Sequence, residues 1–230
     1  MKPLLLLRPE PGWTVSAETA RDMGMEVVGA PLFAIEPVGW DAPDSSDFDG
    51  LLVGSANAFR HAGDHVKRYA KLPVHVVGQA TADAARSAGL MAGQVGKGGL
   101  QSVLDRLEGR ELRLLRLAGE ERVPLKAPEG LSIETRVVYR AVPQSLELPE
   151  PLLRGTVVAL HSGAAAGRFA QECERLKVDR TKFIVVAIGP RVAEMVGEGW
   201  ASVHIAWTPD DGAMLALAKS LCQESSDGDG

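Results

Sequence analysis

Residues 51–55 read Leu-Leu-Val-Gly-Ser, and residues 158–162 read Val-Ala-Leu-His-Ser, 107 positions further along the chain. In both copies an alanine follows three residues after the serine, at Ala58 and Ala165. A short apolar run that ends in small residues and opens a helical pattern is typical of a buried strand entering a helix. The two stretches therefore predict two copies of one strand–helix unit.

Four further pairs of segments follow the same order, at offsets between 106 and 113 residues. A period this long indicates two similar domains rather than a solenoid, whose units are about 20–50 residues long. Two similar domains that face each other leave a cleft, and clefts between domains are favoured ligand sites. The pairs are 4–8 with 112–116, 24–27 with 130–133, 78–83 with 189–194, and 99–104 with 212–217.

The composition is that of an ordinary globular protein, with 45% hydrophobic and 24% charged residues in a chain of 230. The net charge of −5 gives no basic field for nucleic acid, and no apolar stretch approaches the ~20 residues of a membrane helix. We therefore expect no nucleic-acid and no membrane partner. Cys173 and Cys222 are isolated, which predicts neither a disulfide framework nor a cysteine metal site and fits the reducing cytoplasm.

Near-continuous apolar runs alternate with helical patterns along the chain. Such a sequence predicts an α/β fold with mostly parallel sheets that are covered on both faces. The expected strands are residues 4–7, 26–28, 50–53, 74–77, 112–117, 156–160, 184–188 and 202–206. The expected helices are residues 16–23, 55–69, 80–88, 100–107, 164–177, 191–196 and 212–221.

Proline-bearing segments indicate where the chain passes between domains. These are Glu36–Asp49, with Pro37 and Pro43, and Val142–Gly155, with Pro143, Pro149 and Pro151, whereas only residues 108–111 separate the first repeat from the second. We therefore expect residues 1–34 to join 143–230 in a discontinuous domain, and residues 38–138 to form an inserted one. The crossings near 32–37 and 136–142 read as extended, and two antiparallel strands can pair there as a linker. The expected fold is two similar three-layer α/β/α domains with parallel sheets, duplicated and swapped.

Four expected strands end in a small-residue turn that opens a helix. In α/β sheets these turns lie at the carboxyl ends of the strands, where ligands bind, and free N–H groups at a helix start favour anions. Alternatively, Ser55 and Ser162 are helix N-caps and the glycines only make tight turns. The presence of these turns in both copies favours an anion-binding site. The turns are Gly54-Ser55-Ala56-Asn57, Gly78-Gln79-Ala80-Thr81, His161-Ser162-Gly163-Ala164 and Gly189-Pro190-Arg191.

Several charged and aromatic residues have two possible roles each. Arginines at or near strand ends can pair with carboxylates or remain solvated at the surface. Tyr139 lies on an expected crossing strand, where its phenol can donate a proton or its ring can simply pack. His61 and His65 have a spacing that permits metal binding, but no third ligand is evident, so we expect no metal site. The arginines are Arg8, Arg116, Arg122 and Arg191.

A set of motifs resembles uroporphyrinogen-III synthase, the HemD-like family, and the resemblance extends over most of the chain. The most similar stretch is Val76-Val77-Gly78-Gln79-Ala80-Thr81-Ala82, followed by Ala88-Gly89. The other stretches, in family order, are the strand to Arg8-Pro9, Gly24–Val27, Pro31, Gly50–Ala58, Leu117–Arg122, Val138-Tyr139, Ser162 and Ala187–Pro190 with Ala193.

This resemblance implies a cofactor-independent hydro-lyase of tetrapyrrole and heme synthesis. Such an enzyme closes linear hydroxymethylbilane to uroporphyrinogen III, with inversion of ring D and loss of water. By the same resemblance, Tyr139 matches the tyrosine that assists departure of the hydroxyl. The matches at Ser55, Thr81, Ser162 and Gly189 bind substrate, largely through the backbone. Gly54 stands where the family often has Thr, and Val192 where it often has a hydroxyl residue.

The motifs and the resemblance together define one expected site. We expect Tyr139 to be catalytic and a larger set of residues to contact the substrate, with no metal and no cofactor in a cytoplasmic monomer. The alternative from a different class is a non-enzymatic two-domain module that binds and senses an anionic small molecule. The expected substrate contacts are Arg8, Gly54, Ser55, Ala56, Asn57, Gln79, Thr81, Gly119, Arg122, Ser162, Gly163, Gly189 and Arg191.

Overall fold

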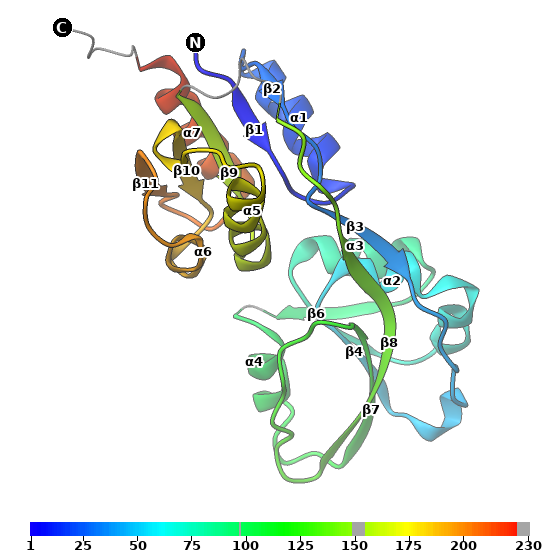
Figure 1. Ribbon diagram of the computed structural model, residues 1–230. Helices are drawn as coiled ribbons and strands as arrows, with labels where there is room; N and C mark the ends of the chain where they lie inside the picture. Colours follow the sequence, from blue (N-terminus) through cyan, green and yellow to red (C-terminus); the bar gives the residue numbers. More distant parts are fainter. Residues whose placement is uncertain (97, 149–154, 225–230) are drawn as a thin grey trace, which may run out of the picture. The chain divides into compact units, whose positions relative to one another are not determined.

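The computed structural model describes residues 1–96, 98–148 and 155–224 of the chain. The chain divides into two compact units, each with one sheet: unit 1 combines Met1–Ala34 with Pro143–Gly230, and unit 2 is Ile35–Val142. Figure 1 shows unit 1 built from the dark blue and the yellow-to-red parts of the chain, and unit 2 from the lighter blue, cyan and green parts. Two of the linker prolines, Pro149 and Pro151, fall outside the described residues.

Unit 1 has a five-stranded sheet in the order β11-β10-β9-β1-β2, and every neighbouring pair is parallel. Its strands are β1 (Leu4–Leu6), β2 (Val27–Val28), β9 (Thr156–Leu160), β10 (Phe183–Ala187) and β11 (Ser202–Ile205). Its helices are α1 (Gly12–Asp22), α5 (Gly163–Arg175), α6 (Pro190–Val196), α7 (Asp211–Gln223) and a 3₁₀ turn at Arg180–Lys182.

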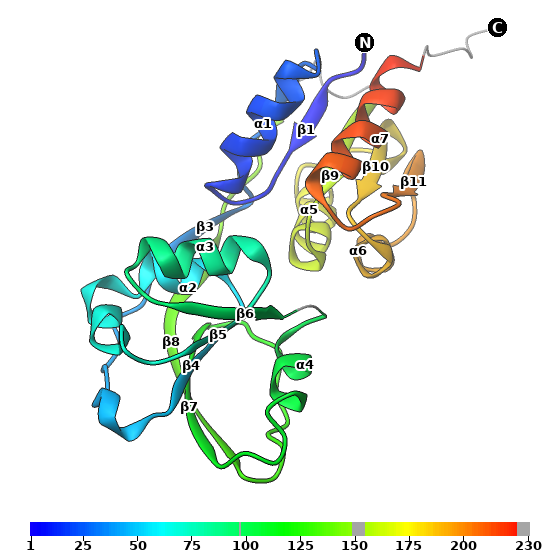
Figure 2. The same ribbon diagram turned by 180° about the vertical axis from the view of Figure 1, so that it is seen from behind.

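The leucines at the start of the chain show that the sheet of unit 1 is buried between two layers of helices. Leu4 and Leu6 belong to the core under α1 and α7, whereas Leu5 and Leu7 belong to the core under α5 and α6. All four side chains are fully buried. Helices on both faces, seen from the two sides in Figures 1 and 2, need apolar side chains at every position of the strand. The expectation of a doubly covered parallel sheet is confirmed.

Unit 2 has a six-stranded sheet in the order β3-β8-β7-β4-β5-β6, and the pairs from β8 to β6 are parallel. Its strands are β3 (Phe33–Pro37), β4 (Gly50–Val53), β5 (Val74–Val77), β6 (Ala92–Gly96), β7 (Leu112–Gly119) and β8 (Leu131–Pro143). Its helices are α2 (Ala56–His61), α3 (Gln79–Ser87), α4 (Leu100–Asp105) and 3₁₀ turns at Ser45–Asp47 and Gly63–Tyr69.

The edge pair β3 and β8 carries the chain between the two units. Val38 N donates to Val138 O at 3.0 Å, and Gln144 N donates to Leu32 O at 2.8 Å. Partner numbers rise along one strand as they fall along the other, so the pairing is antiparallel. Glu36 and Arg140 add a salt bridge of 2.9 Å between the same two strands.

Two sequence-based assignments need correction. The single helix expected at residues 55–69 is wrong: α2 ends at His61, and the chain continues as a 3₁₀ segment from Gly63, whose φ is +66°. A residue with positive φ cannot continue an α-helix. Strand β6 is absent from the expected strands, because Ala92–Gly96 contains a single β-branched residue, Val95.

The two sheets share one plan, and their registers correct the repeat alignment. Ser55 and Ser162 both cap a helix, so β4 corresponds to β9. Leu6 lies beside Ala159 on β9, and Arg116 lies beside Leu52 at the corresponding position of β4. Arg116 is therefore the counterpart of Leu6, and the alignment of Arg116 with Arg8 is wrong by two residues.

The connection from β1 to β2 in unit 1 differs from the corresponding connection from β7 to β8 in unit 2. In unit 1 helix α1 connects β1 to β2, and α1 packs on the sheet through Ala17 and Ala20. In unit 2 the chain passes from β7 to β8 through residues 120–130, which form no helix. Unit 2 thus lacks helical cover over one part of its sheet.

A buried carboxylate attaches the returning chain to unit 1. Glu172 on α5 is 1% exposed and pairs with Arg168 at 2.9 Å and with Arg175 at 2.8 Å. Its Oε2 also accepts a hydrogen bond from Leu146 N at 2.8 Å. The Arg175 hydrogen bond is the main cause that holds the pKa of Glu172 below its usual value. This network positions Leu146, which is buried in the unit 1 core.

We predict that Glu172→Ala lowers the free energy of unfolding by roughly 1–3 kcal/mol, because it leaves the buried Leu146 N–H without its acceptor and removes the carboxylate that pairs with Arg168 and Arg175. The matched control is Glu174→Ala on the same helix, whose exposed pair with Arg180 should contribute at most about 1 kcal/mol. Urea unfolding at neutral pH measures both changes.

The free energy of unfolding that is lost in Glu172→Ala should also depend on pH. A carboxyl with a lowered folded pKa stabilises the protein fully above its unfolded pKa of about 4.3, and this contribution disappears as pH falls through the folded value. The difference between wild type and Glu172→Ala should therefore shrink below about pH 4. An equal loss in both glutamate variants would contradict the assignment.

Candidate functional site at the strand ends

The carboxyl ends of the parallel strands carry most of the predicted site residues. Because the strand interiors are buried on both faces, polar groups collect where each strand opens into a turn. In unit 2 these turns follow β4, β5 and β7, and in unit 1 they follow β1, β9 and β10.

Tyr139 lies against the end of β7 in unit 2. The register of β8 shifts at this point, so Gly119 pairs with Tyr139 rather than Val138. A Cβ on Gly119 would lie 2.7 Å from the ring carbons Cε2 and Cζ and 2.9 Å from the phenol oxygen. Glycine at 119 therefore allows the phenol to rest on the backbone at the strand end.

His61 and Arg122 are near the Tyr139 ring and the loop beside it. The rings of His61 and Tyr139 are 6.4 Å apart between centroids. Burial, with help from Arg60, lowers the pKa of His61, so its imidazole is neutral at neutral pH. Arg122 folds back on the same loop, where Nη1 donates to Glu120 O at 2.8 Å. A phenol, a neutral imidazole and a guanidinium thus surround this end of β7.

The turn after β4 has the capping role that the sequence left open for Ser55. Ser55 Oγ accepts a hydrogen bond from Asn57 N at 3.3 Å, so this serine is an N-cap. Capping uses the hydroxyl oxygen as an acceptor, and its proton remains available for a carboxylate. The preceding Gly54 leaves space for Leu100, since a Cβ there would lie 2.9 Å from Cδ1 of that leucine.

The turn after β5 begins with a glycine in the left-handed region. Gly78 has φ +79° and opens α3, a conformation that side chains rarely adopt. Gln79 points along the helix, where its amide donates to Asp83 at 2.9 Å. Thr81 is only 5% exposed. This turn therefore offers backbone N–H groups more readily than the two side chains predicted from the sequence.

In unit 1 the turn after β9 has the same construction as the turn after β4, whereas the turn after β10 differs from the turn after β5, since Gly189 is extended with φ −172°. Ser162 caps α5 and accepts from Ala165 N at 3.2 Å. A Cβ on Gly163 would overlap with Met195 Sδ, so glycine there allows α6 to approach α5. Gly189 precedes α6, whose first residue is Pro190, and the following Arg191 is exposed.

A polar network joins four elements at the end of β1. Asp211 accepts from Arg8 at 3.1 Å and from Ser16 at 2.7 Å, and it lies 2.7 Å from His161 Nε2. Burial lowers the pKa of His161 despite the opposing effect of Asp211, so the neutral ring donates through Nε2. Arg8 is therefore already neutralised by a carboxylate. The neighbouring Asp210, rather than Asp211, caps α7.

Neither cysteine has the properties of a catalytic nucleophile. Burial raises the pKa of Cys173 to about 12 and that of Cys222 to about 11, so both thiols stay protonated at neutral pH. His65 stacks edge-on against Trp40, whereas His61 faces Tyr139, and the described part of the chain holds no cluster of metal-ligating residues. No described helix is long and apolar enough to cross a bilayer.

A hollow of about 490 Å³ lies between α2 and α3 in unit 2. None of the predicted substrate contacts lines it, and we assign it no substrate. Its lining residues are Phe59, Arg60, Ala80, Asp83, Ala84, Ser87 and Ala88.

Comparison with known proteins matches this chain to one protein family and to solved structures of one fold. Residues 15–216 match the family model described as uroporphyrinogen-III synthase HemD. Uroporphyrinogen-III synthetase from Helicobacter pylori is similar in structure, with a TM-score of 0.66, 16% identity, and coverage of 96% of this chain and 100% of that one. A mutant uroporphyrinogen III synthase from the extremely thermophilic bacterium Thermus thermophilus gives a TM-score of 0.59, 21% identity, and coverage of 97% and 100%. No curated protein sequence matches the chain.

We predict that Gly119→Ala displaces the Tyr139 ring, because the new methyl group would occupy its place. Overpacking of this kind costs roughly 1–3 kcal/mol. The chain has two tyrosines, so ring-labelled tyrosine gives two sets of NMR signals. The Tyr139 set should move and the Tyr69 set should not. Gly39→Ala is the control, since nothing lies near its Cβ position; unchanged Tyr139 signals in Gly119→Ala would refute the contact.

Proposed function

Because the chain belongs to the uroporphyrinogen-III synthase HemD family, we propose that Tyr139 and the strand-end turns carry the reaction of that family. The enzyme closes linear hydroxymethylbilane to uroporphyrinogen III, with inversion of ring D and loss of water. It is a cyclising lyase that needs no cofactor. Nothing in the comparisons favours a non-enzymatic binding module.

Loss of the substrate hydroxyl is the step that needs a side chain. A hydroxide leaves poorly at neutral pH, so a positioned donor must supply a proton or a strong hydrogen bond. We assign this role to the phenol of Tyr139. The observation that supports it is the phenol oxygen resting on Gly119 at a carboxyl strand end, where α/β sheets bind ligands.

The turns supply substrate contacts that are mostly backbone N–H groups. The substrate carries many carboxylates, and the N-termini of α3 and α5 present unpaired N–H donors that favour anions. Ser55 and Ser162 can each add one hydroxyl proton. The complete proposed set of contacts is Arg8, Gly54, Ser55, Ala56, Asn57, Gln79, Thr81, Gly119, Arg122, Ser162, Gly163, Gly189 and Arg191. In this set, Arg8 contacts the substrate while it keeps its salt bridge to Asp211.

Three further properties complete the proposal. The two compact units are the folding domains, with residues 1–34 and 143–230 in one and 38–138 in the other. The protein works as a monomer. It functions in the cytoplasm, without nucleic-acid or membrane partners; the two free, buried cysteines support a reducing compartment.

The direct test is turnover of freshly prepared hydroxymethylbilane, with the porphyrin isomers separated after oxidation. Wild-type protein should give isomer III in excess of isomer I, which forms without the enzyme. Isomer I alone would contradict the proposed function.

We predict that Tyr139→Phe slows formation of isomer III by about 10²–10⁴-fold, the usual contribution of general acid assistance. The ring and its packing remain, so folding should be unchanged. Tyr69→Phe is the control, because its phenol only donates to Pro43 O at 2.7 Å within the core. It should lower stability without lowering turnover per folded molecule. Wild-type turnover in Tyr139→Phe would leave Tyr139 as a packing residue.

We predict a much smaller effect for the two capping serines. Ser55→Ala and Ser162→Ala should each reduce turnover by a few-fold, since one hydrogen bond is worth only about 1 kcal/mol. Each should also cost about 1 kcal/mol of stability through loss of the N-cap. Complete loss of activity in a folded serine variant would indicate a conventional nucleophile and contradict the backbone-binding scheme.

A further inference from the structure

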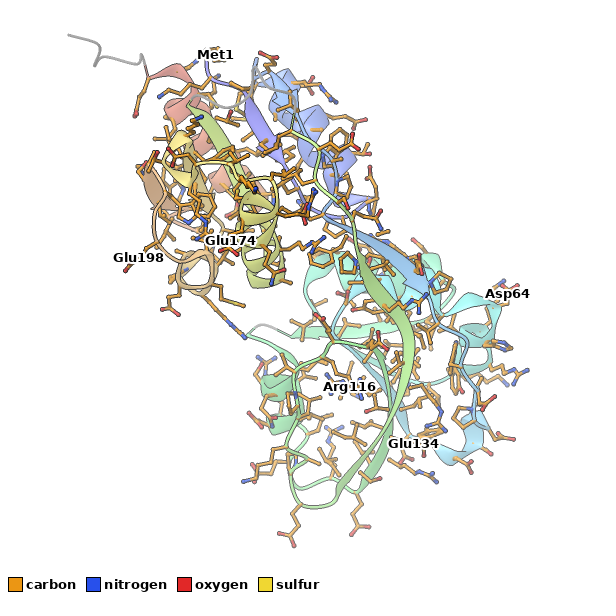
Figure 3. All side chains as sticks on the ribbon, viewed as in Figure 1. Met1, Asp64, Arg116, Glu134, Glu174 and Glu198 are labelled. Carbon is orange, nitrogen blue, oxygen red and sulfur yellow. The ribbon has the colours of Figure 1, made fainter. Side chains whose placement is uncertain are left out.

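Arg116 on β7 is a buried cation that forms no ion pair within the described residues. It is 7% exposed, and its Nη2 donates to Val123 O at 2.9 Å. Its Nε is buried without a hydrogen-bond partner. In Figure 3 the side chain lies inside unit 2, on the side of β7 where α4 lies. Buried charges are normally paired, so an unpaired arginine here has a stability cost that needs an explanation.

The duplicated fold shows that this position does not require a charge. Its counterpart in unit 1 is Leu6, which is fully buried beneath α1 and α7. In unit 2 the segment 120–130 replaces the helix, and it covers Arg116 through the carbonyl of Val123. The Val123 side chain is 64% exposed, so solvent reaches this segment directly. An apolar side chain would fill this position of the sheet, as Leu6 does in unit 1. The presence of an arginine therefore indicates that its charge binds a ligand.

The groups around Arg116 add positive charge rather than remove it. Burial lowers the pKa of its guanidinium, and Arg122 acts in the same direction. The Tyr139 phenol is within electrostatic range as well. The nearest described carboxylate on the adjacent strand, Glu134, already pairs with Arg113 at 2.9 Å and Arg136 at 2.6 Å. No acidic side chain of the described chain compensates Arg116.

We propose that Arg116, together with Arg122, forms an anion subsite that binds one carboxylate of the substrate beside Tyr139. The carboxylate would pair with this guanidinium, whose Nε has no other partner among the described residues. The bound anion supplies the charge that the folded chain leaves uncompensated. The assignment of a substrate carboxylate rests on the proposed function, whereas the anion subsite itself rests on the burial and pairing of Arg116.

The test compares Arg116→Leu, which installs the residue of the sister unit, with Arg113→Gln on the same strand. Arg113 is exposed and already paired, so its removal is the matched control. The probe is uroporphyrin III, whose binding is measured by fluorescence titration at two salt concentrations. Arg116→Leu should raise the Kd roughly 10- to 100-fold, as expected for one lost charge-assisted hydrogen bond, and should weaken its salt dependence. Arg113→Gln should bind as wild type does.

The stability of Arg116→Leu distinguishes an anion-binding role of Arg116 from a purely structural one. Removal of an uncompensated buried charge should leave the urea midpoint unchanged or raise it. Unfolding of Arg116→Leu, or wild-type affinity for uroporphyrin III in this variant, would overturn the proposal. The binding comparison does not depend on catalysis. A wild-type protein that forms no uroporphyrinogen III but loses binding in Arg116→Leu would refute the proposed reaction and retain the subsite.

Discussion

The rest of the structure depends on the burial of the central strands of each sheet on both faces. Leu4 to Leu7 show the constraint most clearly, since each successive side chain enters the opposite core and all are fully buried. A strand of this kind has little place for an unpaired polar side chain along its length, and Arg116 on β7 is an exception. Backbone N–H groups become available at the strand ends, where the chain opens into turns.

Because the fold is duplicated, this protein has two sheet edges formed by carboxyl strand ends, and these edges differ in charge. At the end of β1, Asp211 neutralises Arg8 and holds it against Ser16 and His161, so that edge is internally satisfied. At the end of β7, Gly119 admits the Tyr139 ring, and the adjacent guanidinium of Arg116 has no carboxylate partner among the described residues. The loss of a helix between β7 and β8 accompanies this difference. Of these two edges, the uncompensated guanidinium lies in unit 2.

Most of the architecture follows from patterns that the sequence carries locally. Buried parallel strands are read from apolar runs, and the caps at Ser55 and Ser162 from a serine before a helical pattern. The missing parts depend on tertiary context. Strand β6 forms because β5 offers it a partner, although Ala92–Gly96 has little strand propensity. The equivalence of Arg116 with Leu6 appears only from strand register, since repeat offsets in the sequence differ by several residues. The pairing of Arg8 with Asp211 joins residues that lie at opposite ends of the chain, which no local pattern predicts.

The charge of the unit 2 edge bears on how a tyrosine can act as an acid. A phenol has an ordinary pKa near 10, so after it gives its proton to a leaving hydroxyl it remains as an anion that must be stabilised. Preorganised positive charge near the place where negative charge develops lowers the barrier to such a step. Arg116 is in range of Tyr139, and Arg122 lies on the loop whose Glu120 N donates to Tyr139 O at 3.0 Å. Under the proposed assignment, the buried charge that costs stability in the folded chain attracts a carboxylate of the substrate and holds it beside the phenol that assists departure of the hydroxyl.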